Sequence, residues 1–372
     1  MTQTPANIRL LVLANGILNP VTRKLIPHTP RYFNTFPPFW FGYDPGAKAP
    51  GFFKFLNEIH KDQENRLMIQ RIFSLCLYKV NPWQVGFLFF GSGANGKGVL
   101  TKILETLLGG KANVTSIGIT SMDEKFDIAP LKNAWLNISQ DMAEISQSKA
   151  LSNMLEGNLK HLIANEDFGF QEKYKNTEHV RPTVKFIFCT NKLPYFADRS
   201  DGIYRRFRYI EFKESFVGRE DTTLETRLLA ELPGILNWVL DGLQMLMNLE
   251  GETFPDTAEG RKIKKIQRSE NDATGTWLRE HCEDADPGEF LELNPLYEDF
   301  KAWHEDFFGN GRYPVKATFK KDIKRVFPRA DERRIKKRVS QYERLNNSSL
   351  AGKSWIDAYC FYGIRLKPME LE

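Results

Sequence analysis

The sequence predicts a three-layer α/β domain with a mainly parallel sheet, followed by a smaller domain of short helices and closing strands. Apolar runs that suit buried strands alternate with helical patterns between residues 85 and 250. A glycine-rich loop follows the first of these runs, at the turn from strand to helix. From residue 274 onward, short helical patterns rich in basic residues precede an aromatic end.

Composition limits the class of protein. The chain has 372 residues, of which 41% are apolar and 27% charged. At about 150 residues per domain, two or three domains are expected. This composition can fill a sizeable core, which excludes a disordered or fibrous protein. Four cysteines without metal-ligand spacing predict buried thiols in a cytoplasmic protein. No membrane span and no secretion signal are evident, so no membrane partner is expected.

The first 80 residues are expected to form an N-terminal helical or collar region. Residues 1–50 are rich in proline and aromatic side chains, with one strand expected at residues 8–12. Residues 51–77 turn helical, because apolar residues such as Phe52, Phe55 and Ile59 recur at helical spacing.

The sheet domain is expected over residues 81–250. Continuous apolar runs predict four strands, the last of them weaker, at residues 85–90, 135–138, 184–189 and 209–212. A helix over about residues 234–249 closes the domain. Residues 251–271 are polar and basic, and we expect a linker or an exposed helix there, before a last domain over residues 272–372.

The glycine-rich loop, residues 91–98, matches the P-loop pattern G-x-x-x-x-G-K. Glycines allow backbone N–H groups to turn toward phosphate oxygens, and Lys97 supplies a charge for the β and γ phosphates. A structural glycine turn is the alternative, but the flanking strand and helix are those that the motif requires. We therefore expect ATP to contact Gly91, Ser92, Gly93, Ala94, Asn95, Gly96, Lys97, Gly98 and Val99.

A magnesium site is expected beside this loop. The hydroxyl that usually follows the P-loop lysine is missing, because Gly98 stands there; Thr101, one turn later, could reach the ion through a water. The run at residues 135–138 leads into Asp141, and a carboxylate at a strand end is where a P-loop ATPase holds Mg²⁺. Gln140 precedes Asp141 where many such proteins carry a second acid, and a solvated strand end is the alternative.

Two further polar positions follow. Asn191 ends the third strand, where an amide can orient the attacking water, although asparagine also ends strands for turn reasons. Arg205 and Arg206 precede the fourth strand. They are either surface charge or a finger that reaches into a neighbouring subunit's nucleotide site.

These motifs, in this order, resemble the superfamily 3 helicases of the AAA+ class, above all the helicase part of phage and plasmid primase-helicases and of the poxvirus primase-helicase. The likeness rests on residues 91–98, 137–141, 189–194 and 201–207, with residues 232–238 after the sheet.

The resemblance implies an AAA+ P-loop core that assembles as a homo-oligomer, usually a hexameric ring, with ATP and Mg²⁺ bound between subunits. It implies translocation on single-stranded or forked DNA, with a primase or polymerase domain or partner elsewhere. Lys97 would contact phosphate, Asp141 the metal, and Asn191 would act as the first sensor. Arg206 would be the finger acting in trans, with Arg205 as the neighbouring candidate.

The resemblance also implies a hairpin that lines the central hole of the ring. The matching segment is residues 170–176, where Lys173 and Lys175 flank Tyr174. This arrangement suits grip on a DNA backbone, and an ordinary exposed charged turn is the alternative.

Positive charge concentrates near the end of the chain. Residues 312–338 hold twelve Lys and Arg against three acids, so the rest of the chain is net acidic. Helices followed by closing strands resemble a winged-helix domain, and such a cluster is typical of a nucleic-acid face. The alternative is a solvated basic face packed on the ring.

The sequence favours an ATP-driven DNA helicase motor for the replication of a phage, virus or plasmid. Two alternatives stay open. One is a DNA-stimulated AAA+ ATPase that loads or remodels without unwinding. The other is a DNA-binding replication protein with a degenerate ATPase site, which Gly98 and Gln140 keep open.

Overall fold

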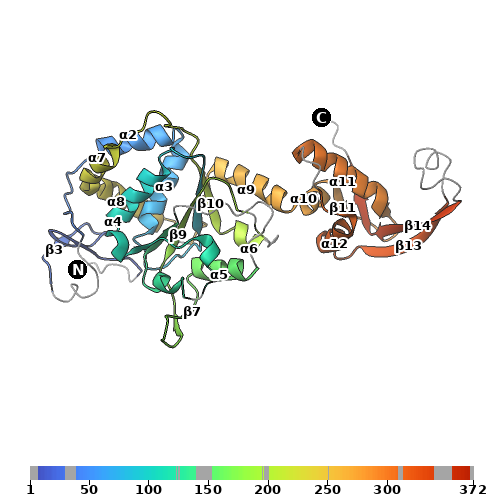
Figure 1. Ribbon diagram of the computed structural model, residues 1–372, viewed down its shortest axis with the longest axis horizontal. Helices are drawn as coiled ribbons and strands as arrows, with labels where there is room; N and C mark the ends of the chain where they lie inside the picture. Colours follow the sequence, from blue (N-terminus) through green and yellow to red (C-terminus); the bar gives the residue numbers. More distant parts are fainter. Residues whose placement is uncertain are drawn as a thin grey trace. The chain divides into compact units, whose positions relative to one another are not determined.

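The computed structural model describes residues 7–29, 39–122, 124, 126–139, 153–194, 196, 201–249, 251–308, 313–338 and 354–368 (Figure 1). The chain divides into two compact units, Met1–Gln267 (unit 1) and Arg268–Glu372 (unit 2). Among the helices of the described ranges, none is both long enough and apolar enough to cross a membrane. All four cysteines are buried and free, as predicted.

Unit 1 is built on a five-stranded sheet in the order β10-β4-β9-β6-β5, with every neighbouring pair parallel. Its strands are β4 (Gly86–Phe90), β5 (Val114–Thr115), β6 (Leu136–Ser139), β9 (Lys185–Thr190) and β10 (Phe207–Glu211). The four predicted strands are thus confirmed, with small shifts of their ends. β5 was not predicted, because two residues carry no readable pattern.

Helices cover both faces of this sheet, so the predicted three layers are present. In β4, Phe87 and Phe89 belong to one core and Leu88 to the other, as strand alternation requires. The first core includes side chains of α2 (Pro50–Ile59), α3 (Gln63–Leu75), α4 (Lys97–Leu107), α7 (Leu224–Ala230) and α8 (Leu232–Met247). The second includes side chains of α5 (Asn153–Ile163) and α6 (Asp201–Tyr204).

The N-terminal segment packs into the first core. Three antiparallel strands, β1 (Leu11–Leu13), β2 (Gly16–Leu18) and β3 (Leu25–Ile26), precede α2 and α3. Their side chains Leu11, Leu13 and Leu18 share the core that contains α3 and α8. The carboxylate of Glu231 accepts bonds from the first N–H groups of α2, Gly51 at 3.0 Å and Phe52 at 2.8 Å. The described part of residues 1–80 is therefore continuous with the sheet domain.

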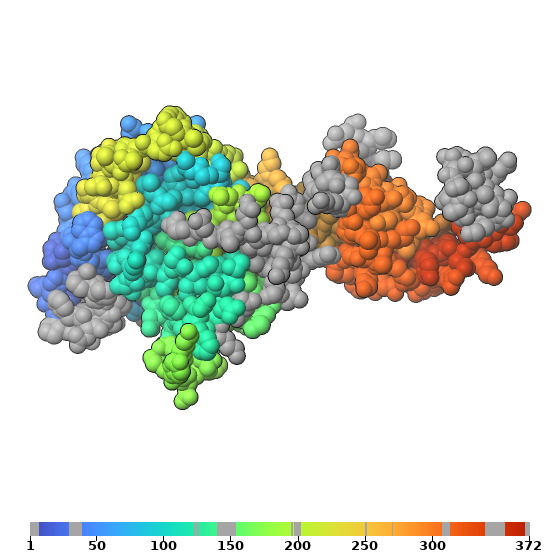
Figure 2. Space-filling model, in the orientation of Figure 1, coloured from blue at the N-terminus to red at the C-terminus, as the bar shows by residue number. Residues whose placement is uncertain are grey.

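The smaller elements of unit 1 lie in its connections. Three short 3₁₀ turns occur at Gly110–Ala112, Ile119–Ser121 and Ala129–Lys132. Strands β7 (Phe168–Phe170) and β8 (Glu178–Val180) form an antiparallel hairpin between α5 and β9. Figure 2 shows this hairpin, in green, standing out from the rest of unit 1.

Helix α9 (Ala258–Asn271) occupies most of the segment where a linker or exposed helix was expected. In the described residues of unit 2, the helices α10 (Ala273–His281), α11 (Leu293–Phe308) and α12 (Lys316–Val326) follow. Its strands are β11 (Cys282–Asp284), β12 (Phe290–Glu292), β13 (Asp331–Arg338), β14 (Trp355–Tyr362) and β15 (Ile364–Leu366). They pair as β12-β14-β13 and β11-β15 around an aromatic core with Trp277, Phe300 and Phe319.

Candidate nucleotide-binding site

The carboxyl edge of the sheet brings the P-loop and Asn191 together. The P-loop follows β4 and Asn191 follows β9, and these two strands are neighbours. The loop is joined to the end of β9, because Gly91 N donates to the Thr190 carbonyl at 3.3 Å. A cavity of about 450 Å³ is lined by residues 93–99 of the loop and by Cys189, Thr190 and Asn191. Gln140 and Asp141 come directly after β6 in the sequence and lie outside the described residues.

Two glycines of the loop hold backbone conformations that other residues rarely adopt. Gly91 has a φ of +143°, and a Cβ there would lie 2.3 Å from the Phe212 carbonyl oxygen. Gly96 has a φ of +89°, and its Cβ would lie 2.6 Å from Cγ2 of Ile59. Both positions therefore require glycine, for conformation and for space. The motif's glycines are explained by the fold of this loop and by what packs against it.

Asn95 braces the loop from within. Its side-chain Nδ2 donates to the carbonyls of Ser92 and, at 3.3 Å, of Phe212. Its Oδ1 accepts from the backbone N–H of Lys97 at 3.3 Å. The side chain is buried. The side-chain amide of Asn95 therefore holds the turn, and its contact with ATP stays a prediction.

Lys97 is the first residue of α4, so its ammonium and the positive end of the helix dipole lie at the same place. Its Nζ donates to the Gly91 carbonyl at 2.5 Å, and the side chain is largely buried. The lysine is thus folded across the loop that begins at Gly91. Oriented N–H groups, a helix N-terminus and a lysine together form an anion-binding arrangement.

Thr101 does not face this cavity. Its hydroxyl bonds back to the carbonyls of Lys97 at 2.9 Å and Gly98 at 3.0 Å, and the side chain is buried. The reach toward a metal that the sequence suggested for Thr101 is therefore not supported. At Gly98, a Cβ would meet no atom within 4 Å. This position is open toward the cavity that Gly98 lines.

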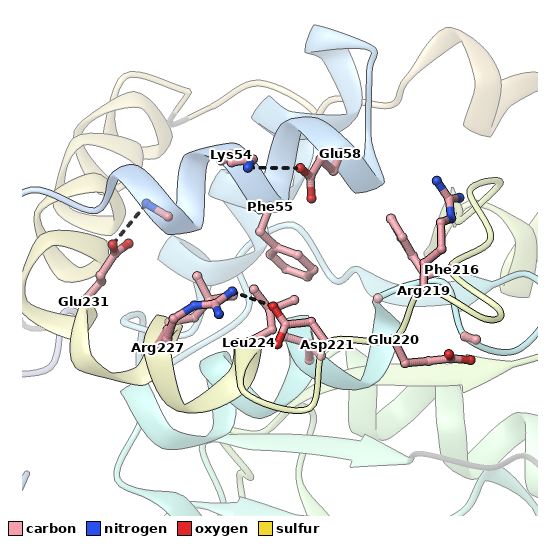
Figure 3. Close-up of a pocket in the computed structure, with 15 residues that line it drawn as sticks. Lys54, Phe55, Glu58, Phe216, Arg219, Glu220, Asp221, Leu224, Arg227 and Glu231 are labelled. Carbon is pink, nitrogen blue, oxygen red and sulfur yellow. Dashed lines mark hydrogen bonds and ion pairs between the residues drawn. The ribbon is translucent and has the colours of Figure 1, made fainter.

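A second cavity, of about 510 Å³, adjoins the first, and the two share Ala94, Gly96 and Val99 as lining residues. Phe55 points into it from α2, and Phe216 also lines it, beside Arg219 (Figure 3). Charged side chains also line this cavity. They come mainly from α2 and from the segment that leads into α7 and α8: Lys54, Glu58, Arg219, Glu220, Asp221, Arg227 and Glu231. The sequence did not predict this cavity, because its walls are far apart along the chain.

One acid on this rim is fixed by local bonds. Asp221 accepts from the hydroxyl and the N–H of Thr223, and it pairs with Arg227 at 2.6 Å (Figure 3). The Thr223 hydroxyl and Arg227 lower the pKa of this carboxyl to about 2. The carboxylate is therefore charged at every physiological pH and organises the start of α7.

The two candidate finger residues lie at the other edge of the sheet. Arg206 precedes β10, and its carbonyl accepts from Gly86 N at 2.9 Å, at the start of β4. β10 and β4 then run side by side for five residues before the P-loop begins. At about 3.3 Å per residue this is roughly 17 Å, longer than an arginine side chain. Neither arginine can reach the P-loop of its own chain.

The two arginines differ in exposure. Arg206 is only 8% exposed, and its Nη1 donates to the Gly202 carbonyl at 2.7 Å. Burial, and then the neighbouring Arg205, lower the pKa of this guanidinium. The side chain of Arg205 is exposed. The sequence favoured Arg206 as the finger residue; in the structure its side chain is buried and bonded to Gly202 of α6, whereas that of Arg205 is exposed.

The predicted hairpin is present as β7 and β8, with its tip at residues 171–177 (Figure 2). Tyr174 is fully exposed and has a φ of +65°. Lys175 pairs with Glu172 at 2.5 Å, and an exposed pair of this kind holds its partners weakly. Lys173 and Tyr174 are therefore presented to solvent at the tip.

Comparison with known proteins gives a partial match to one family model. A family of unknown function, DUF5906, matches residues 89–206, about a third of the chain. This range begins at the end of β4 and extends to Arg206. It contains the P-loop, Asn191 and the hairpin.

Two viral proteins are similar in sequence over part of their length. "Putative helicase L207/L206" of Acanthamoeba polyphaga mimivirus is 25% identical over 177 residues, which are 45% of this chain and 18% of that protein. "Putative helicase 022R" of Frog virus 3 (isolate Goorha) is 23% identical over 265 residues, 67% of this chain and 27% of that protein. The chain thus spans about a fifth to a quarter of the length of these relatives.

Two apo structures of the NrS-1 C-terminal region share the fold. One matches with a TM-score of 0.53 and 15% identity, over 87% of this chain and 77% of that region. The other matches with a TM-score of 0.51 and 14% identity, over 96% of this chain and 97% of that region. At this identity the likeness concerns the fold. The sequence similarity to proteins named as helicases is separate from it.

Proposed function

We propose that this chain is an ATP-dependent DNA helicase motor of the superfamily 3, AAA+ type, acting on single-stranded or forked DNA during viral, phage or plasmid replication. One observation carries the proposal: Lys97 and Asn191 line the same cavity, at the carboxyl edge of a parallel sheet. In such an arrangement the P-loop can bind the phosphates of ATP, and the polar residue at the strand end can orient water toward the γ-phosphate. The names of the viral relatives support the same class.

The two cavities suit the two parts of the nucleotide. Loop N–H groups and Lys97 would hold the phosphates in the first cavity. The base would enter the second, between Phe55 and Phe216, because it shares loop residues with the first and offers aromatic walls. Mg²⁺, when bound, would neutralise charge on the β and γ phosphates, with Asp141 as its protein ligand. Asn191 would position the attacking water.

Hydrolysis in this proposal needs a second copy of the chain. Arg205 is exposed at the amino edge of the sheet, remote from the P-loop of the same chain. Arginine stabilises the charge that spreads over a transferring phosphoryl group. Arg205 of one subunit would therefore complete the site of the next, in a ring that is usually hexameric. Arg206 would position it by anchoring the turn to α6.

DNA would pass along the hairpins of the ring. Lys173 and Tyr174 stand at an exposed tip, and a cation beside an aromatic ring suits a single strand. Unit 2 would act as the winged-helix-like domain that follows the motor. Priming would reside elsewhere in a longer protein or in a partner, consistent with relatives much longer than the matched segment.

The test is ATP hydrolysis and strand separation by the purified chain, with and without single-stranded DNA. Lys97→Ala is expected to lower hydrolysis at least about 100-fold, since the lysine contacts the phosphates directly. Lys111→Ala, which removes an exposed lysine elsewhere in unit 1, should leave it unchanged. DNA-stimulated hydrolysis without strand separation would instead indicate an ATPase that loads or remodels.

A second candidate function, binding of DNA and nucleotide without hydrolysis, is favoured by the lack of side-chain ligands for a metal ion at the described positions 98 and 101 beside the P-loop. Gly98 has no side chain, and the Thr101 hydroxyl is engaged by α4. A protein that binds DNA and nucleotide without turnover fits that arrangement. Equal and slow hydrolysis by the wild type and Lys97→Ala would support this candidate and overturn the motor.

A further inference from the structure

The longest ribbon of unit 2 carries a face of cations and aromatic rings. β13 and β14 pair over eight residues, with Arg334 opposite Tyr359, Lys336 opposite Asp357 and Arg338 opposite Trp355. Residues directly opposite each other in an antiparallel pair share a face, and so do alternate residues of each strand. We call the face that bears Arg334, Lys336, Arg338, Trp355, Asp357 and Tyr359 the ribbon face. In Figure 1 the ribbon extends beyond the helices of unit 2.

Helix α12 continues this face with more positive charge. The Lys320 ammonium lies 4.3 Å from the centre of the Tyr359 ring. Lys320 and Lys324 both pair with Glu332 of β13, Lys324 at 2.9 Å. Together α12, β13 and β14 carry ten Lys and Arg against four Asp and Glu. The basic side of the helix and the ribbon face are therefore one surface.

The outer part of the ribbon face is the least neutralised. Asp357 pairs with Arg334, and Glu332 is shared by two lysines. Asp357 lies directly opposite Lys336 but pairs with Arg334, and among the described residues no ion pair involves Lys336 or Arg338. Like charges on one exposed face repel each other in the free protein. A polyanion laid along the ribbon would remove that repulsion.

Trp355 lies at the same end of the ribbon and is 59% exposed. An exposed indole offers a flat apolar face on which another ring can stack. Cations beside an exposed aromatic ring are typical of surfaces that stack an unpaired base and hold its phosphates. A duplex would leave the ring uncovered, because its bases are stacked on each other. The face thus fits a nucleic acid with unpaired bases better than a continuous duplex.

We propose that the ribbon face binds single-stranded DNA, with Lys336 and Arg338 on phosphates and Trp355 stacked on an unpaired base. This site lies in unit 2, does not involve the hairpin tip of unit 1, and needs no nucleotide at the P-loop. It can therefore hold even if the motor proposal fails.

The experiment measures binding of a labelled single-stranded oligonucleotide, and of a blunt duplex of the same length, by the full chain without ATP at several salt concentrations. Lys336→Ala combined with Arg338→Ala should weaken single-strand binding and reduce the salt dependence by about 1.4 in log–log slope. Trp355→Ala should weaken single-strand binding about tenfold and leave the slope unchanged. The duplex should respond to the charge variant and not to Trp355→Ala.

Matched controls come from unit 1. Lys79→Ala combined with Lys111→Ala removes two exposed lysines, and Trp40→Ala removes a ring exposed to 61%. None of these should change DNA binding. Ultraviolet cross-linking of the oligonucleotide to the wild type should place an adduct on the peptide that contains Trp355.

Three results would overturn the proposal. Ribbon variants that bind the single strand as tightly as the wild type would show that the surface is not the binding site. An equal loss of duplex and single-strand binding in Trp355→Ala would refute stacking on an unpaired base. Displacement of the oligonucleotide by polyglutamate at equal charge concentration would show that the face accepts any polyanion. Loss of ATP hydrolysis with DNA binding intact would count against the motor alone.

Discussion

At the scale of single residues, the position after the P-loop lysine, Gly98, determines how a metal ion could be bound. Gly98 leaves the cavity without the hydroxyl that usually binds magnesium, and Thr101 does not replace it, because its hydroxyl is bonded to α4. The first protein ligand of the metal in this proposal is therefore a single carboxylate. Weak metal binding follows from so few ligands.

Gly98→Ser tests this account. A Cβ at Gly98 meets no atom within 4 Å, and the position is in the first turn of α4, so the variant is expected to fold. The new hydroxyl should lower the Mg²⁺ concentration needed for half-maximal ATP hydrolysis, by about threefold to tenfold, the worth of one modest ligand bond. Gly98→Ala is the control and should keep the wild-type dependence. A serine variant with unchanged magnesium dependence would contradict the account.

Gly96 and Gly93 form a second matched pair of residues. Gly96 has a positive φ and would place a Cβ 2.6 Å from Ile59, whereas a Cβ at Gly93 meets no atom within 4 Å. Gly96→Ala is expected to cost about 1–3 kcal/mol of stability through backbone strain and to weaken nucleotide binding. Gly93→Ala should remain close to the wild type. Thermal unfolding and titration with a fluorescent nucleotide measure both effects, and equal behaviour of the two variants would refute the argument.

At the scale of the element, α2 connects the N-terminal segment to the P-loop. It is held at its first turn by Glu231, and near its end Ile59 packs against Gly96. His60 follows the helix, largely buried, with its ring 4.6 Å from that of Phe212. Burial lowers the pKa of His60 to about 4, with Glu259 and Asp62 opposing this shift. The imidazole is therefore neutral in the folded chain at neutral pH.

This predicts a specific acid sensitivity. The unfolded chain takes up a proton at the ordinary histidine pKa of about 6.5, while the folded chain does so only near 4. Stability is therefore fully present above pH 6.5 and falls, by at most about 1.4 kcal/mol per pH unit, as the pH drops toward 4. Urea unfolding at several pH values should show this slope, and His60→Gln should reduce it. A variant that keeps the full slope would assign the sensitivity to other groups.

Elements with a strong local signal were predicted correctly from the sequence. The strand β4 is a continuous apolar run, and β6, β9 and β10 are mainly apolar, because both faces of a parallel sheet are buried. The pairing of β1 with β2 and β3 was missed, since only one short apolar run stands out there. The P-loop was found because its residues are contiguous.

The rest of the site depends on contacts between distant segments. Phe55 and Phe216 face one cavity although about 160 residues separate them, and no local pattern relates them. Arg206 is likewise buried and bonded to Gly202 in α6, which the sequence does not reveal. The sequence alone therefore offered no reason to prefer Arg205 as the finger that acts in trans. The sequence was therefore sufficient to find the P-loop, whereas the exposure of Arg205 and the burial of Arg206 depend on tertiary packing.

At the scale of the whole molecule, the nucleotide loop and the exposed arginine lie at opposite edges of one sheet. In the proposed ring, each complete site needs the loop of one copy and the arginine of another. Lys97→Ala and Arg205→Ala should each abolish hydrolysis. A mixture of the two inactive proteins should regain activity, because random assembly makes about a quarter of the seams intact.

Two controls define this mixing experiment. A chain that carries both Lys97→Ala and Arg205→Ala should give no activity when it is mixed with either single variant, because none of the seams formed is intact. Arg206→Ala should behave as a destabilised protein, with a lower melting temperature, since its side chain is buried. A mixture that remains inactive although the two proteins co-assemble would refute the shared site.

The separation of the loop from Arg205 has a consequence for how energy is used. An isolated monomer would bind ATP without hydrolysing it, and hydrolysis would begin only after several copies had assembled. The turnover of each molecule should then climb with protein concentration instead of staying constant. Because hydrolysis depends on assembly, ATP would be consumed only at those places in the cell where the local concentration of the protein is high enough for it to assemble.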